Sequence, residues 1–147
     1  MEKWLPVAAT CVAGGLIALQ APVNALLGRS TGSVPAAAIN FLCGTLVLLA
    51  LVVVIGQAGG LADSTDVPWY YIVSGGVLGA IYVTTTLITV RSLGAGGVTA
   101  ATVAGQLTAS VTADRLGILG LEERALSAPR IVGVMLLVAG TLLVVRA

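Results

Sequence analysis

The sequence predicts an all-α membrane protein with five transmembrane helices. Of its 147 residues, 58% are hydrophobic and only 9% are charged, and the mean hydropathy is +1.08. A soluble domain of this length buries only about 70% of its surface, so it could not hide so much apolar area, whereas a bilayer accepts it. The apolar segments take up nearly the whole chain and leave no room for a soluble catalytic domain.

Five apolar stretches reach or approach the roughly 20 residues that a helix needs to cross the hydrocarbon core. They cover Trp4–Leu27, Pro35–Gly56, Pro68–Val90, Gly94–Ala113 and Pro129–Val145. Three of them begin with proline, which suits a helix start because its missing N–H would have no partner in the first turn anyway. We therefore expect a single transmembrane domain over residues 1–147.

Several functional classes are disfavoured by composition. The chain has no histidine, no cluster of metal-ligating side chains and no nucleophile–base pair, so we expect no metal, no cofactor and no enzymatic activity. The net charge of +1 comes without a basic cluster, so nucleic acid is not an expected partner. Cys11 and Cys43 both lie in apolar spans, which argues against a disulfide framework. The first span is longer than the apolar region of a signal peptide and is expected to be a retained helix.

The basic residues give little information about orientation. Five spans place the termini on opposite sides, with Lys3, Arg115, Arg124 and Arg130 on the N-terminal side and Arg29, Arg91 and Arg146 on the other. Such a small difference is almost no positive-inside bias. We expect insertion in both orientations, so that two copies form an antiparallel homodimer with ten helices and an inverted repeat. A single orientation set by other features is the alternative.

Small residues recur every four positions in two of the spans. They are Gly75 and Gly79 in the third span, and Gly97, Ala101, Gly105 and Ala109 in the fourth. Lipid tails provide no hydrophobic drive for helices to associate, so close backbone approach through small residues matters more. These stripes predict helix packing faces.

Polar uncharged residues interrupt the apolar spans and are candidates for substrate contact. They are Gln20, Asn24, Asn40, Tyr82, Thr85, Thr102 and Gln106. Each needs a hydrogen-bond partner inside the bilayer, and facing inward together they would line a polar, largely uncharged cavity. The alternative for each amide is interhelical hydrogen bonding that contributes about 1 kcal/mol or less.

Asp114 lies at the end of the fourth span, and no other acidic residue falls within a span. A carboxylate in a membrane segment suggests proton coupling. The alternative is an interfacial residue that pairs with a nearby arginine. Arg29, Arg91 and Arg130 lie at helix ends and are expected to be interfacial anchors.

A set of residues along the chain resembles a known family. Its second half contains Gly94, Ala95, Ala104, Gly105, Gln106, Asp114, Gly117, Arg130 and Gly133, and the part from Gly105 and Gln106 through Asp114 to Gly117 is the most specific. Earlier in the chain the pattern includes Gln20, Asn24, Asn40, Phe41, Gly44, Gly75, Gly76, Gly79, Ala80 and Tyr82. Together they resemble the YdcZ-like proteins of the drug/metabolite transporter superfamily. The resemblance implies a five-helix exporter of the bacterial inner membrane, from a family with dual-topology chains, oppositely oriented pairs and fused ten-helix proteins.

These observations lead us to expect a small-molecule transporter that works by alternating access as an antiparallel dimer. Small multidrug transporters of the same superfamily use a glutamate in the first helix, where this chain has Gln20 and Asn24. Its aromatic content of 4% also provides few cation–π partners. We therefore expect a polar neutral or zwitterionic metabolite. The expected partners are lipid, substrate and a second copy or homologous chain of opposite orientation. The alternative is a structural or regulatory membrane subunit.

Overall fold

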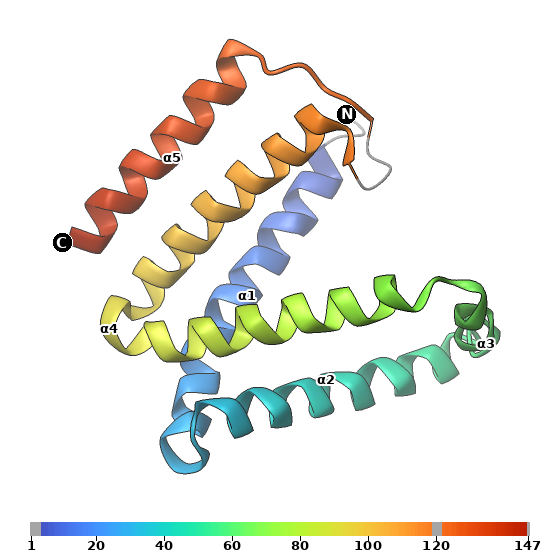
Figure 1. Cartoon of the computed structure of the whole chain (residues 1–147). Helices are drawn as coiled ribbons and strands as arrows, with labels where there is room; N and C mark the ends of the chain where they lie inside the picture. Colours follow the sequence, from blue (N-terminus) through green and yellow to red (C-terminus); the bar gives the residue numbers. More distant parts are fainter. Residues whose placement is uncertain (1–3, 119–121, 147) are drawn as a thin grey trace. The chain divides into compact units, whose positions relative to one another are not determined.

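The computed structural model describes residues 4–118 and 122–146, which are mostly helical and contain no strand. The elements are α1 (Trp4–Thr31), α2 (Ser33–Val54), α3 (Gly59–Asp63), the 3-10 helix η1 (Ser64–Asp66), α4 (Trp69–Leu116) and α5 (Ala128–Arg146) (Figure 1). Among them, α1, α2, α4 and α5 are long and apolar enough to cross a membrane. The prediction of an all-α membrane protein is confirmed at this level.

Helix α4 contains a break that accounts for its unusual length of 48 residues. Gly94 has φ 67° and ψ 169°, which is not helical, so two helical segments cover residues 69–93 and 95–116. Each segment has the length of about one bilayer crossing. The break falls at the residue where the sequence predicts that the fourth span begins. This conformation is essentially restricted to glycine, because a Cβ would be strained there.

The chain forms two compact units, Met1–Arg91 and Ser92–Ala147. The first contains α1, α2, α3, η1 and most of the first segment of α4. The second contains the second segment of α4 and α5. Each unit has its own packing contacts and is described separately below.

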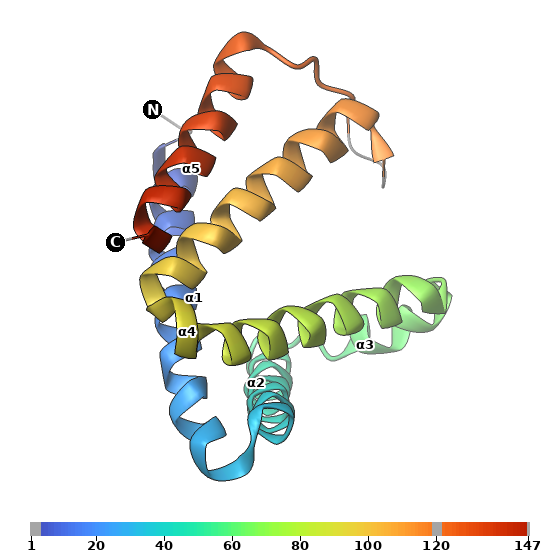
Figure 2. The same ribbon diagram turned by 60° about the vertical axis from the view of Figure 1, so that its left-hand side comes forward.

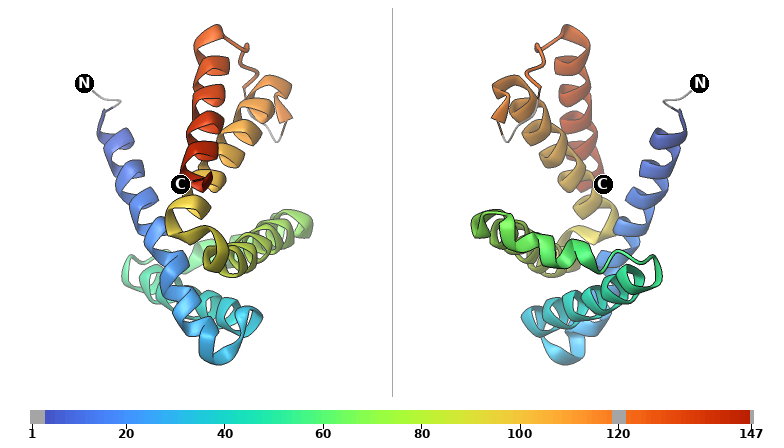
Figure 3. Two further views of the ribbon diagram at one scale, coloured as in Figure 1. Left: turned by 90° about the vertical axis from the view of Figure 1, so that its left-hand side faces the viewer. Right: turned by 90° about the vertical axis from the view of Figure 1, so that its right-hand side faces the viewer.

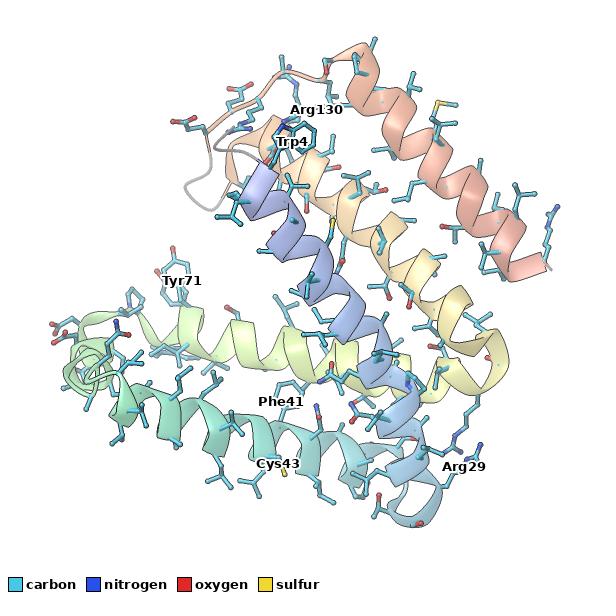
Figure 4. The ribbon with its side chains drawn as sticks, turned by 180° about the vertical axis from the view of Figure 1, so that it is seen from behind. Trp4, Arg29, Phe41, Cys43, Tyr71 and Arg130 are labelled. Atoms are coloured by element: carbon cyan, nitrogen blue, oxygen red, sulfur yellow. The ribbon has the colours of Figure 1, made fainter. Side chains whose placement is uncertain are left out.

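In the first unit, α2 packs along the first segment of α4. The Cζ atom of Phe41 lies 3.2 Å from the position that a Cβ would occupy at Gly79, and Figure 4 shows Phe41 between these two helices. The small core consists of the buried residues Ala36, Ala37, Val83 and Leu87, with Ala25, Leu27 and Tyr82 packed against it. The closest packing in this unit therefore involves small residues, as expected for helices in lipid.

Helix α1 joins this core only through its C-terminal part. Residues 4–17 are all exposed, whereas Asn24 and Gly28 are buried. Both views in Figure 3 show the N-terminal half of α1 apart from α2. At Gly28 an added Cβ would lie 3.0 Å from Cδ2 of Leu87, so the absence of a side chain lets the helices approach. Gly32, with φ 88°, then turns the chain into α2, and its N–H donates to the Gly28 carbonyl at 3.0 Å.

In the second unit, the second segment of α4 and α5 form an antiparallel hairpin (Figure 2). Cγ2 of Val145 lies 3.6 Å from the Cβ position at Gly97. The Thr141 hydroxyl donates to the carbonyl oxygen of Ala100 at 3.0 Å. At the other end of the hairpin, Gly117 with φ 57° ends α4, in the left-handed conformation typical of helix C-termini.

We expect Gly94→Ala to destabilise the protein by about 1–3 kcal/mol, because alanine is strained at this backbone conformation. Gly96→Ala is the matched control: Gly96 is helical and the nearest atom to its Cβ position, Cγ1 of Val144, is 3.9 Å away. The midpoint of thermal unfolding in detergent measures the effect. An equal change in both variants would show that the break at Gly94 imposes no special backbone requirement.

Candidate functional site

The predicted contact residues of the first unit differ in exposure. Asn24 is buried, with 6% of its surface exposed. Gln20, Asn40 and Tyr82 are half-buried, and Thr85 is exposed. Tyr82 packs against the core of the unit. These residues come from α1, α2 and the first segment of α4, which are the helices that form this unit.

These residues differ from other polar residues of the helices in their hydrogen bonding. The hydroxyls of Thr10 and Thr86 donate to backbone carbonyls three or four residues earlier, at 2.8 and 3.0 Å. By contrast, within the described part of the chain no side-chain hydrogen bond is made by Gln20, Asn24, Asn40, Tyr82 or Thr85. A primary amide has two donors and an acceptor oxygen with two lone pairs. These amides are therefore free to bind water, a ligand or another chain.

The second unit holds the other two predicted contact residues, Thr102 and Gln106. Thr102 is half-buried and Gln106 is exposed. Neither makes a side-chain hydrogen bond to a described residue, whereas Thr108 and Thr112 donate to carbonyls one turn back, both at 2.8 Å. Gln106 thus presents an unpaired amide on a helical segment long enough to span the bilayer.

The predicted packing residues also behave differently from one another. Gly79 is approached by Phe41, and Gly97 by Val145. A Cβ at Gly75 or Gly105 would meet no atom within 4 Å. Ala101 and Ala109 are exposed. Within one chain, each stripe therefore has one glycine in close contact and further small residues with free space beside them.

Asp114 forms an ion pair between the last turn of α4 and the first turn of α5. Its Oδ2 lies 3.4 Å from Nη1 of Arg130, and each side chain is 30% exposed. This distance is longer than the usual 2.7–3.2 Å or so of an N–H···O hydrogen bond, and Nη1 has no hydrogen-bond partner among the described residues. The Asp114 carbonyl accepts the Arg124 N–H at 2.8 Å. This geometry fits an interfacial acid paired with arginine, and proton coupling by Asp114 stays a prediction.

The approach of Arg91 to α1 was not predicted from the sequence, which suggested only that Arg91 is an interfacial anchor. Its Nη2 atom lies 3.5 Å from the Cβ position of Gly28, so the guanidinium extends over α1. Gly28 follows Asn24 by one helical turn and shares its face. The four-residue spacing of Asn24 and Gly28 indicates a polar side chain next to a position without one. Nothing in the sequence identifies Arg91 as the residue whose side chain approaches Gly28.

One pocket lies away from the predicted contact residues. It has a volume of about 420 Å³ and lies around α3 and the C-terminal end of α2, where Gln57 and Asp63 are its polar residues. Among residues 4–118 and 122–146, no group of three or more Cys, Asp or Glu side chains could hold a metal ion. The unpaired amides, rather than this cavity, define the candidate site.

A double-mutant cycle tests the ion pair at the end of the hairpin. For Asp114→Asn and Arg130→Gln we expect a coupling free energy of about 0.5–1 kcal/mol, because the partly exposed charges interact in a high dielectric. The more exposed pair Arg115–Glu123 is the control, with a coupling near zero. Strictly additive effects of Asp114→Asn and Arg130→Gln on the free energy of unfolding would contradict the pairing.

Comparison with known proteins agrees with the architecture described above. A sequence model of the family described as "Putative inner membrane exporter, YdcZ" matches residues 5–143. No curated protein and no solved structure matches the chain. The family match spans all four helices that are long and apolar enough to cross a membrane, which makes the chain a multi-pass inner-membrane protein. The chain therefore belongs to the YdcZ family of inner membrane exporters.

Proposed function

We propose that the protein is a small-molecule transporter that works by alternating access as an antiparallel dimer. The observation that carries this proposal is that the amides of Gln20, Asn24, Asn40 and Gln106 make no hydrogen bond within the described chain. Interhelical hydrogen bonding, the main alternative role for such groups, requires a partner that neither unit provides within its described residues. In hydrocarbon an unpaired polar group costs several kcal/mol, so these amides need a water-filled cavity, a substrate or a second chain.

A second copy would provide such a cavity. No residue of α5 is buried, and Gly75 and Gly105 have free space beside them, so several helical faces are available for contact. The near balance of basic residues on the two sides supports insertion in both orientations. Two opposite copies would have equivalent inward-open and outward-open states, so the substrate gradient sets the direction of transport.

The substrate class follows from the side chains at the site. The predicted contact residues are amides, hydroxyls and one phenol, and they include no carboxylate. Asp114 lies at a helix end and is paired with Arg130. Amides and hydroxyls donate and accept hydrogen bonds without charge, which supports a polar neutral or zwitterionic metabolite over a lipophilic cation.

The transport proposal is tested with proteoliposomes loaded with a small-molecule extract of the host cells. We expect specific polar compounds to leave vesicles that contain the protein, as followed by mass spectrometry of the external solution. Gln106→Ala and Asn24→Ala should slow this release about tenfold or more, because a hydrogen bond to the substrate is lost. Gln57→Ala is the control: this glutamine follows α2 outside the helical spans, and its removal should leave release unchanged.

Two results would contradict the proposal. If the assembled protein releases no compound faster than empty vesicles do, a structural or regulatory role is favoured. If Gln106→Ala prevents recovery of folded, assembled protein, that amide holds helices together instead of contacting substrate.

A further inference from the structure

Asn24 combines deep burial with unused hydrogen-bonding capacity. Only 6% of the residue is exposed, and its amide has no hydrogen-bond partner among the described residues. It lies on the face of α1 that continues at Gly28, where Leu87 and Ala36 approach to 3.0 and 3.7 Å of the Cβ position. The amide nitrogen and oxygen of Asn24 are not among the fully buried side-chain atoms that lack a partner, so they stay accessible although most of the residue is buried. The amide of Asn24 is therefore available to a ligand.

Arg91 brings a positive charge to the same face. Its Nη2 atom lies 3.5 Å from the Cβ position of Gly28, one turn and about 6 Å along the axis from Asn24. The ion pairs of the described residues join Arg115 to Glu123 and Asp114 to Arg130, so Arg91 has no carboxylate partner there. The described acidic residues of this unit, Asp63 and Asp66, lie before the start of α4, at the opposite end of its first segment.

We propose that Arg91 and Asn24 bind a small molecule that carries a carboxylate. The planar guanidinium fork matches the two carboxylate oxygens, and the amide of Asn24 binds a polar group next to that carboxylate. Gly28 makes this possible because a side chain at that position would occupy the space beside the guanidinium. The inference rests on the proposed transport function. Within the proposed substrate class it selects zwitterions over neutral metabolites, and it adds organic anions that carry a carboxylate.

A simpler role for Arg91 is electrostatic. A basic side chain near the C-terminal end of α1 stabilises the helix dipole and anchors the helix at the interface. Such a role requires only a positive charge, and Arg29 in the last turn of α1 satisfies it equally well. Figure 4 shows Arg29 at this end of α1. Arg29 is exposed and has no ion-pair partner among the described residues either, so it serves as an internal control.

The test measures protection of individual arginines in the full-length protein in lipid nanodiscs. Phenylglyoxal modifies free guanidinium groups, and peptide mass spectrometry gives separate rates for Arg91 and Arg29. The probes are N-acetylglycine and N-acetylglycinamide, which differ only in a carboxylate against a primary amide. We expect N-acetylglycine to slow modification of Arg91 at least severalfold while leaving Arg29 unchanged, and N-acetylglycinamide to protect neither. Asn24→Ala should raise the half-protecting concentration about tenfold.

Equal protection by the two probes, equal protection of the two arginines, or no protection by N-acetylglycine up to its solubility limit would overturn the carboxylate site. These results are separable from the fate of the transport proposal. If Arg91 is not protected but Asn24→Ala still stops release from proteoliposomes, the transport proposal is supported and the proposal of a carboxylate-binding site is wrong. If Arg91 is protected but no compound crosses the membrane, the carboxylate-binding site is supported and the transport proposal is wrong.

Discussion

The structure depends above all on where the amide side chains of membrane-spanning helices find their hydrogen bonds. In water an unpaired amide has little effect, but in hydrocarbon it costs several kcal/mol. Threonines such as Thr108 and Thr112 meet this requirement locally by donating to their own helix. The asparagine and glutamine side chains of these helices make no such hydrogen bond among residues 4–118 and 122–146. They lie on α1, α2 and the second segment of α4, and on the proposed function water, substrate or a second copy supplies their hydrogen bonds.

Glycine gives the helices the geometry that this arrangement needs. Gly94 divides α4 into two segments of bilayer length, and Gly32 reverses the chain between α1 and α2. Gly28 has a different role, because it lets Leu87 pack against α1 and leaves room for the guanidinium of Arg91. The guanidinium of Arg91 thus reaches the face of α1 that carries Asn24.

Much of the helical architecture could be predicted from the sequence, because apolar length is a strong signal in membrane proteins. The break at Gly94 was predictable as a boundary between spans, and the non-helical conformation of this residue divides α4 there. The candidate site could be predicted less well from the sequence. Polar residue types mark Asn24 and Gln106, but only the three-dimensional structure shows that Asn24 is deeply buried while Gln106 is exposed. The reach of Arg91 to Gly28 depends on how two helices cross, which periodicity does not encode.

The orientation of the chain in cells shows whether two oppositely inserted copies can complete the polar site. Single reporter cysteines near each terminus, in a background with Cys11 and Cys43 replaced, are labelled with a membrane-impermeant thiol reagent. Both cysteines are free in the structure and must be removed. Dual insertion predicts that about half of the molecules are labelled at each end. Complete labelling at one terminus and none at the other would contradict the antiparallel homodimer.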